Sequence, residues 1–287
     1  MIEIGVLLAL FSAFTSSLRE SIRKHVSRDF SSVEIGFVTQ VYGVILLAPF
    51  AGWYLFKSSI SFTPGLVFAI FVSAIGVLSS TYVYVEAMRI SDLSVTEPLR
   101  QMAPIIVALI EPVVLGTDFS YKILIAALMG AGGSYILVSD KGLKQPIQNL
   151  RNKGALMALT TAGIFAVIAI VKRFGSTNIE PLLFTYFTYI LGLIGFWTWK
   201  KRNNEKIGKD RFLRKDVFSM GVVTAFGAVV TIYAFSMISA SETVVIKQAS
   251  GIFGILMGRK FFNEDNIIRK LIGALIIIAG VVLVALI

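Results

Sequence analysis

The chain has 287 residues, of which 56% are hydrophobic and only 15% are charged, whereas soluble domains carry about 25% charged residues. It contains no cysteine and a single histidine, His25, which excludes disulfides, thiol catalysis and multi-histidine metal sites. The formal net charge of +10 does not indicate a nucleic-acid partner, because basic residues collect in the cytoplasmic loops of membrane proteins and no soluble basic domain is present.

Ten apolar segments follow one another along the chain, and each has the roughly 17 to 24 residues needed to cross about 30 Å of hydrocarbon. A backbone in lipid must satisfy its own hydrogen bonds, and the alternating pattern of a barrel strand is missing, so each segment is predicted to be a helix. The fold class is therefore all-α integral membrane, with ten transmembrane helices. The predicted spans are 3–22, 34–56, 65–88, 93–115, 120–139, 153–172, 181–199, 217–238, 241–261 and 268–286.

The two halves of the chain repeat at a nearly constant offset. Gly5 recurs as Gly154 after 149 residues, and the pair Arg100-Gln101 recurs as Lys247-Gln248 after 147 residues. Five spans per half is an odd number, so the second copy enters the membrane from the opposite face. We predict two inverted five-helix repeats, 1–140 and 153–287, joined by a polar linker at 141–152, with a substrate site between the halves.

The distribution of basic residues predicts the orientation. Loops that follow odd-numbered spans hold 21 Lys and Arg residues, whereas loops that follow even-numbered spans hold 4. Basic residues are enriched in cytoplasmic loops, so we expect a multi-pass protein of the cell membrane with both termini outside.

Charges inside a bilayer are expensive, and a cation in a span is a functional hypothesis by default. Arg100 and Lys247 occupy equivalent positions in spans four and nine, and each is followed by a glutamine, Gln101 and Gln248. Because the repeats are inverted, the two cations flank the midplane from opposite sides, where they could bind a carboxylate or phosphate. The competing interpretations are a simple ion pair of Arg100 with Glu97, or snorkelling to the interface.

Other polar residues in the spans are weaker candidates. Arg19, Glu20 and Arg23 are interpreted as the boundary of the first span. Glu86 and Glu97 are candidates for coupling to protons. Further candidates for lining the substrate site are Tyr82, Tyr84, Tyr233 and Gln40.

The ends of each half resemble the EamA-type members of the drug/metabolite transporter superfamily. The first half ends with Ala87-Met88-Arg89-Ile90-Ser91, Pro104 and Gly116, and the second with Ala234–Ser241, Glu264 and the closing stretch Leu271–Leu283. The resemblance implies alternating access around a central cavity, driven by a gradient. Related phosphate translocators carry a Lys-Arg pair in span nine; this chain has Gln248 in place of the second basic residue, which leaves carboxylates, including amino acids, open. Typical members also carry their basic cluster after span two, whereas here it follows span seven.

These observations favour a secondary transporter of a small anionic or zwitterionic metabolite. The alternative is a proton-coupled exporter of hydrophobic or cationic compounds that uses Glu86 and Glu97, and a scaffold or receptor is least favoured. No enzyme signature is found, and no cofactor or metal is expected. The expected partners are a small-molecule substrate, the lipid bilayer and a coupling proton or ion, with no nucleic acid and with a homodimer left open.

Overall fold

The computed structural model describes residues 2–57, 60–91, 96, 99–138, 153–202, 212–253 and 267–286. These residues form helices and short connections, and no strand occurs among them, which confirms the all-α prediction. The helices are α1 Ile2–Val26, α2 Ser32–Lys57, α3 Pro64–Ile90, α5 Ala103–Leu115, α6 Tyr121–Val138, α8 Lys153–Asn178, α9 Pro181–Arg202, α11 Lys215–Met237, α12 Ala240–Lys247 and α14 Ile267–Ala285.

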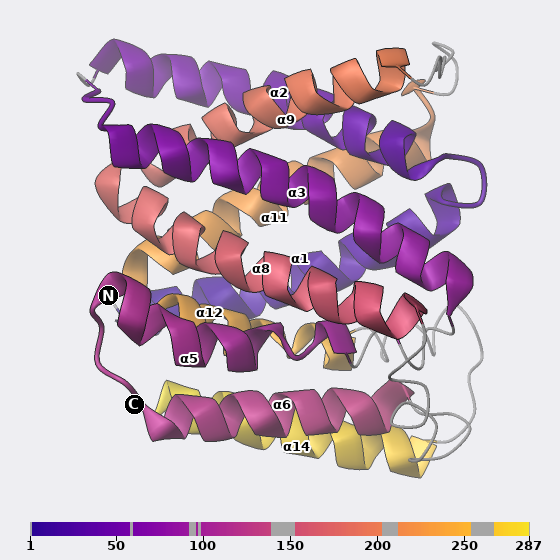
Figure 1. Ribbon diagram of the computed structural model, residues 1–287, viewed down its shortest axis with the longest axis vertical. Coiled ribbons are helices and arrows are strands. Elements are labelled where there is room, and N and C mark those ends of the chain that lie inside the picture. Colours follow the sequence, from indigo (N-terminus) through magenta and orange to yellow (C-terminus); the bar gives the residue numbers. More distant parts are fainter. Residues whose placement is uncertain are drawn as a thin grey trace.

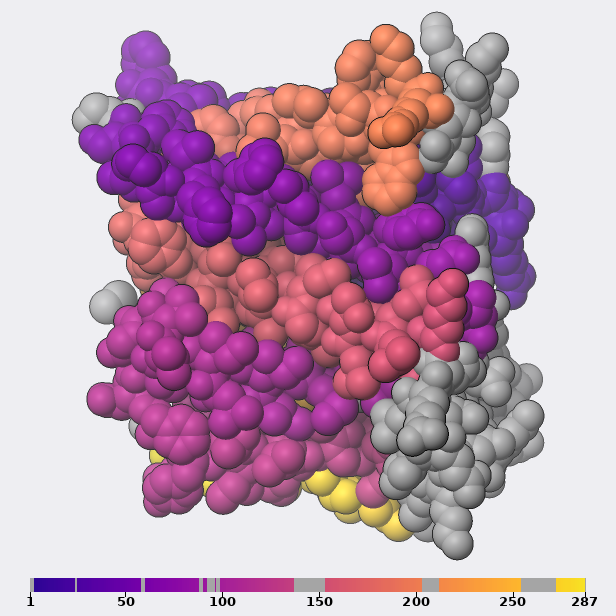
Figure 2. All heavy atoms as spheres, in the orientation of Figure 1, coloured from indigo at the N-terminus to yellow at the C-terminus, as the bar shows by residue number. Residues whose placement is uncertain are grey.

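Length and composition identify five of the described helices as able to cross a membrane: α2, α3, α8, α9 and α11. The helices α5, α6 and α14 contain shorter apolar stretches. Large apolar side chains also remain on the outside of the bundle, such as Phe68 and Phe71 on α3 and Val113 on α5. Figure 2 shows one such face, which is built from α2, α9, α3, α8, α5 and α6. Such a surface suits a lipid environment.

The helices pack in the pattern that an inverted repeat requires. In sequence, α1, α2, α3 and α6 of the first half correspond to α8, α9, α11 and α14 of the second. The equivalent helices α2 and α9 pack on each other, as do α6 and α14. The other two large interfaces are α3 with α8 and α1 with α11. Replacing each helix by its repeat equivalent turns the first of these interfaces into the second. The largest helix interfaces therefore join one half to the other, and Figure 1 shows the helices of both halves interleaved.

Both chain ends lie on one face of the bundle. In Figure 1 the marked termini are on the left, together with the connections from α5 to α6 and from α8 to α9. The connection from α1 to α2 is on the opposite, right-hand face. We call these faces the terminal face and the loop face.

Local sequence sets several helix ends. The Thr63 hydroxyl accepts a hydrogen bond from the Leu66 N–H at 3.2 Å, and Pro64 opens α3 where its missing N–H removes no helical hydrogen bond. Gly116 ends α5 in the left-handed region, with φ of 67°. Glycine adopts that conformation without the steric penalty of a Cβ atom.

Spans four and nine are not continuous helices, which corrects the predicted spans 93–115 and 241–261. The chain makes a turn at Gln101–Met102 before α5 and a turn at Gln248–Ala249 after α12. Pro104 lies at the start of α5, where it cannot donate a helical hydrogen bond. The second turn contains no proline. The two breaks occupy equivalent positions in the repeat.

Two helices extend several residues beyond the predicted spans. Helix α1 continues to Val26 and α8 to Asn178, beyond the expected ends at residues 22 and 172. Arg19, Glu20 and Arg23 all lie within α1, and their interpretation as the boundary of the first span stays a prediction.

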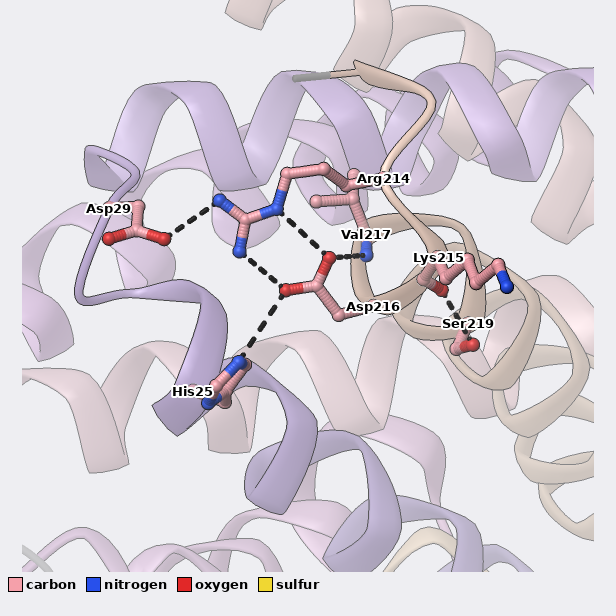
Figure 3. A network of polar contacts seen from close by, with 7 residues as sticks. All are labelled: His25, Asp29, Arg214, Lys215, Asp216, Val217 and Ser219. Atoms are coloured by element: carbon pink, nitrogen blue, oxygen red, sulfur yellow. Dashed lines mark hydrogen bonds and ion pairs between the residues drawn. The ribbon is translucent and has the colours of Figure 1, made fainter. Parts of the chain in front are cut away.

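An ion-pair network joins the two halves at the loop face (Figure 3). Arg214, at the start of α11, bonds Asp29 of the α1–α2 connection at 2.7 Å and Asp216 at 2.7 Å. These hydrogen bonds to two carboxylates raise the pKa of the Arg214 guanidinium. The His25 imidazole lies 3.8 Å from Asp216 and is 64% exposed. The network is close to solvent and holds the α1–α2 connection against α11.

We predict that Gly133→Ala disrupts the interface between α6 and α14. A Cβ atom on Gly133 would lie 2.7 Å from the Gly273 carbonyl oxygen, so the two backbones would have to separate. We expect a loss of about 1–3 kcal/mol in unfolding free energy, as for other overpacked sites. The measurement is thermal unfolding in detergent.

The neighbouring Gly132 supplies the control, because a Cβ atom there meets nothing within 4 Å. Gly132→Ala should be neutral or stabilise the helix by up to about 1 kcal/mol. Equal melting temperatures for the two variants would contradict close packing at Gly133.

Candidate substrate site

Five partly buried cations from both halves lie close together, and we call them the cation cluster: Arg19 and Arg23 of α1, Arg100 before α5, Lys172 of α8 and Lys247 of α12. Lys247 interacts electrostatically with Arg19, Lys172 and Arg100. Helix α12 packs on both α1 and α8, which brings these side chains together. The predicted pair Arg100 and Lys247 is thus part of a larger group.

One carboxylate, Glu20, lies within the cation cluster. It accepts from Arg19 at 3.0 Å and pairs with Arg23 at 2.9 Å, and it also interacts electrostatically with Arg100. The side chains of Arg19 and Glu20 keep 37% and 41% of their surface accessible. Solvent or a small ligand can therefore reach them.

Aromatic rings position the arginines. The guanidinium carbon of Arg100 lies 5.1 Å from the Tyr84 ring centre, and that of Arg23 lies 5.7 Å from the same ring. The ring centre of Phe165 in α8 lies 5.7 Å from the guanidinium carbon of Arg100. Cation–π contacts of this kind stabilise an arginine without neutralising its charge.

The two lysines are the least compensated members of the cluster. The ammonium of Lys247 donates to the Thr231 hydroxyl at 3.3 Å. Within the described part of the chain, neither Lys247 nor Lys172 pairs with a carboxylate, and Lys172 has no hydrogen bond. The buried Nε of Arg19 also lacks an acceptor among these residues. A partly buried cation without a counter-charge is unfavourable, so this arrangement favours binding of an anion.

The repeat contains a signal for this cluster that the sequence reasoning missed. Arg23 lies 149 residues before Lys172, the same offset that relates the other equivalent positions of α1 and α8. The cluster therefore contains two repeat-related cation pairs, Arg23 with Lys172 and Arg100 with Lys247. Comparing charges at this offset would have found Lys172 and Arg23.

The predicted glutamines meet where the two helices break. The side-chain amide of Gln248 donates to the Gln101 carbonyl at 3.3 Å, so the turns of the two halves touch. Gln248 is 2% exposed, and its side-chain oxygen has no partner among the described residues. It packs so tightly on α6 that a Cβ atom on Gly130 would clash with that oxygen.

Tyr82, Tyr233 and Gln40 do not join the cation cluster. Tyr82 is 43% exposed and packs on Trp199, with ring centres 5.0 Å apart. The Tyr233 hydroxyl donates to the Glu180 carboxylate. Gln40 is buried between α2 and α9, and its side-chain oxygen has no partner among the described residues. Of the predicted tyrosines, Tyr84 is the one in contact with the arginines.

The two coupling candidates are placed differently. Glu86 lies partly buried near the end of α3, and Glu97 lies outside the described residues. Their proposed role in proton coupling stays a prediction.

A buried carboxylate holds the two halves together toward the terminal face. Both oxygens of Glu111 in α5 accept backbone N–H groups at the start of α12, from Ala240 and Ser241, each at 2.7 Å. Arg173 of α8 interacts electrostatically with Glu111 and donates to the Phe235 carbonyl. A carboxylate at a helix N-terminus is favourable because it pairs with the unsatisfied N–H groups and the helix dipole.

Inverted halves, broken helices at their contact and charges enclosed between apolar helices together define a membrane transporter. The chain belongs to the EamA-like transporter family, which matches residues 3–139 and 152–286. It is 23% identical over 246 residues to an uncharacterized transporter of Archaeoglobus fulgidus, covering 83% of this chain and 84% of that protein. A solved crystal structure shares the fold, with a TM-score of 0.77 at 13% identity over 98% of each chain.

We predict that Glu20→Gln makes folding depend on added anions. The substitution removes the carboxylate that Arg19 and Arg23 share, so repulsion within the cation cluster increases. The melting temperature in low-salt detergent should fall, and sodium sulfate should raise it more than in the wild type.

Glu3→Gln is the matched control, because Glu3 is exposed in the first turn of the same helix. It should respond to sulfate as the wild type does. An unchanged melting temperature and sulfate response in Glu20→Gln would contradict the compensating role.

Proposed function

We propose that the protein is a secondary transporter of a small anionic metabolite, which binds at the cation cluster and crosses by alternating access. The observation that carries this proposal is the convergence of cations from both repeats on a region where the two lysines pair with no described carboxylate. An anion bound there would contact both halves of the protein. Its binding would offset the repulsion among the cations of the cluster.

The broken helices support alternating access. Arg100 and Lys247 each lie directly beside a turn, and these turns touch through Gln248 and Gln101. In transporters, non-helical backbone within the membrane is tolerated where it is enclosed by protein or lines a cavity. Rocking one repeat against the other would change the access to this region while its residues stay close together.

Cationic compounds suit this region poorly. A cation would be repelled by the cluster, and Glu20 already pairs with two arginines. A zwitterion would gain at the lysines through its carboxylate, but its ammonium would add a further positive charge. These considerations favour an anion over the cation-exporter alternative.

We predict that small carboxylated or phosphorylated compounds stabilise the wild-type protein in detergent, and that Arg100→Ala/Lys247→Ala abolishes this. A ligand at one hundred times its dissociation constant raises the stability of the folded state by about 2.7 kcal/mol. The measurement is a thermal-shift screen, followed by uptake of the stabilising compounds into proteoliposomes.

Lys122→Ala/Lys215→Ala is the matched control, since both lysines are exposed at helix starts. It should keep the stabilisation and the uptake. If cationic or neutral compounds alone stabilise the protein, and Arg100→Ala/Lys247→Ala responds as the wild type does, the anion proposal fails.

We also propose that the terminal face is extracellular and the loop face cytoplasmic, in accord with the excess of basic residues in loops after odd-numbered spans. The chain has no cysteine, so a maleimide reacts only with a cysteine that is introduced by substitution. In intact cells, an impermeant maleimide should label Thr117→Cys, between α5 and α6, and should label Ser27→Cys, after α1, only once the cells are opened. The reverse pattern would invert the topology.

A further inference from the structure

The two halves compensate their cations differently. In the first half, Glu20 pairs with Arg19 and Arg23 at 3.0 and 2.9 Å and interacts with Arg100. In the second half, the position equivalent to Glu20 by the offset of 149 residues is Ala169. Alanine has no carboxylate, so position 169 cannot neutralise Lys172 as Glu20 neutralises charge in the first half.

The two lysines are the members of the cation cluster that contact no described carboxylate. Lys172 has no hydrogen bond or ion pair with a described residue, and Lys247 has the Thr231 hydroxyl alone at 3.3 Å. A hydroxyl oxygen accepts from the ammonium but does not cancel its charge. Each ammonium has three donors, so both lysines retain donors for a ligand.

Arg19 joins the lysines from the opposite repeat. It interacts electrostatically with both Lys172 and Lys247. Its terminal Nη2 is used by Glu20, whereas its Nε is buried and has no acceptor among the described residues. This N–H group remains for a ligand held beside the lysines.

We infer that Lys172, Lys247 and the Nε of Arg19 form the subsite for the anionic part of the substrate, and that this subsite takes a doubly charged anion. The inference rests on the proposed function and narrows it to a class of substrate. Glu20, Arg23 and Arg100 then form a neighbouring group that stays paired within the protein and shapes the subsite.

The double charge follows from the two lysines. Neither Lys172 nor Lys247 contacts a described carboxylate, so an anion with one negative charge would leave one of the two lysines without a counter-charge. A phosphate monoester or a compact dicarboxylate supplies two charges and enough oxygens for both lysines and the Arg19 N–H. These two sources share the same chemistry, and simple probes separate them.

The test measures binding to the full-length protein in detergent by calorimetry, with succinate, inorganic phosphate and acetate as probes at pH 8. We expect succinate, phosphate or both to bind the wild type at least tenfold more tightly than acetate. Binding of succinate alone indicates two carboxylates, and binding of phosphate alone indicates a single doubly charged group. Equal affinity for acetate would overturn the requirement for two charges.

Substitutions then locate the subsite. Lys172→Gln should weaken binding of the doubly charged probe on the order of tenfold or more, as expected for loss of a charged hydrogen bond. Lys172→Arg keeps the charge and should bind within a few-fold of the wild type, which separates loss of charge from loss of folding. Lys153→Gln, at the exposed start of the same helix, should leave the affinity unchanged.

The outcomes distinguish this inference from the proposed function. If the wild type binds a doubly charged anion but Lys172→Gln binds it equally well, the subsite is wrong while anion transport stands. The same conclusion follows if Arg23→Gln weakens binding as much as Lys172→Gln does. If the wild type binds none of the probes and transports no anion, both are overturned.

Discussion

A charge enclosed by apolar helices must meet a partner of opposite sign, and this requirement organises the centre of the protein. Helices from both repeats bring arginines and lysines to one region, where Glu20 pairs with two of the arginines. Most of the other buried residues are apolar or small. Packing does not require two lysines that contact no described carboxylate, and the proposed anion would give them a counter-charge.

The inverted repeat makes the two halves of the cation cluster similar, but the halves differ at the positions of Arg19 and Glu20. Equivalent cation pairs and equivalent helix breaks arise from the repeat, so the two halves present similar groups to a ligand. Arg19 and Glu20 have the apolar counterparts Ile168 and Ala169. This difference places the carboxylate of the cluster in the first half, whereas the two lysines that contact no described carboxylate belong to the second half.

The two faces of the bundle are held by different chemistry. Toward the terminal face, the buried Glu111 binds backbone N–H groups of α12, an interaction shielded from water and salt. At the loop face, Arg214 joins Asp29 and Asp216 near solvent, where screening weakens ion pairs (Figure 3). Under alternating access, each contact between the halves would have to break in turn, and the solvent-exposed one requires less energy to open.

The sequence by itself determined the all-α membrane fold and the inverted repeat, because apolar length and a constant offset are properties of the chain alone. It also identified Arg100 and Lys247, since a cation within a span stands out against its apolar neighbours. Only the tertiary structure showed that α1 continues past Arg23, that Lys172 lies close to Lys247, and that Glu20 pairs with arginines while the lysines contact no described carboxylate. Those facts depend on which helices pack together, and pairing between side chains far apart in the chain is decided by that packing.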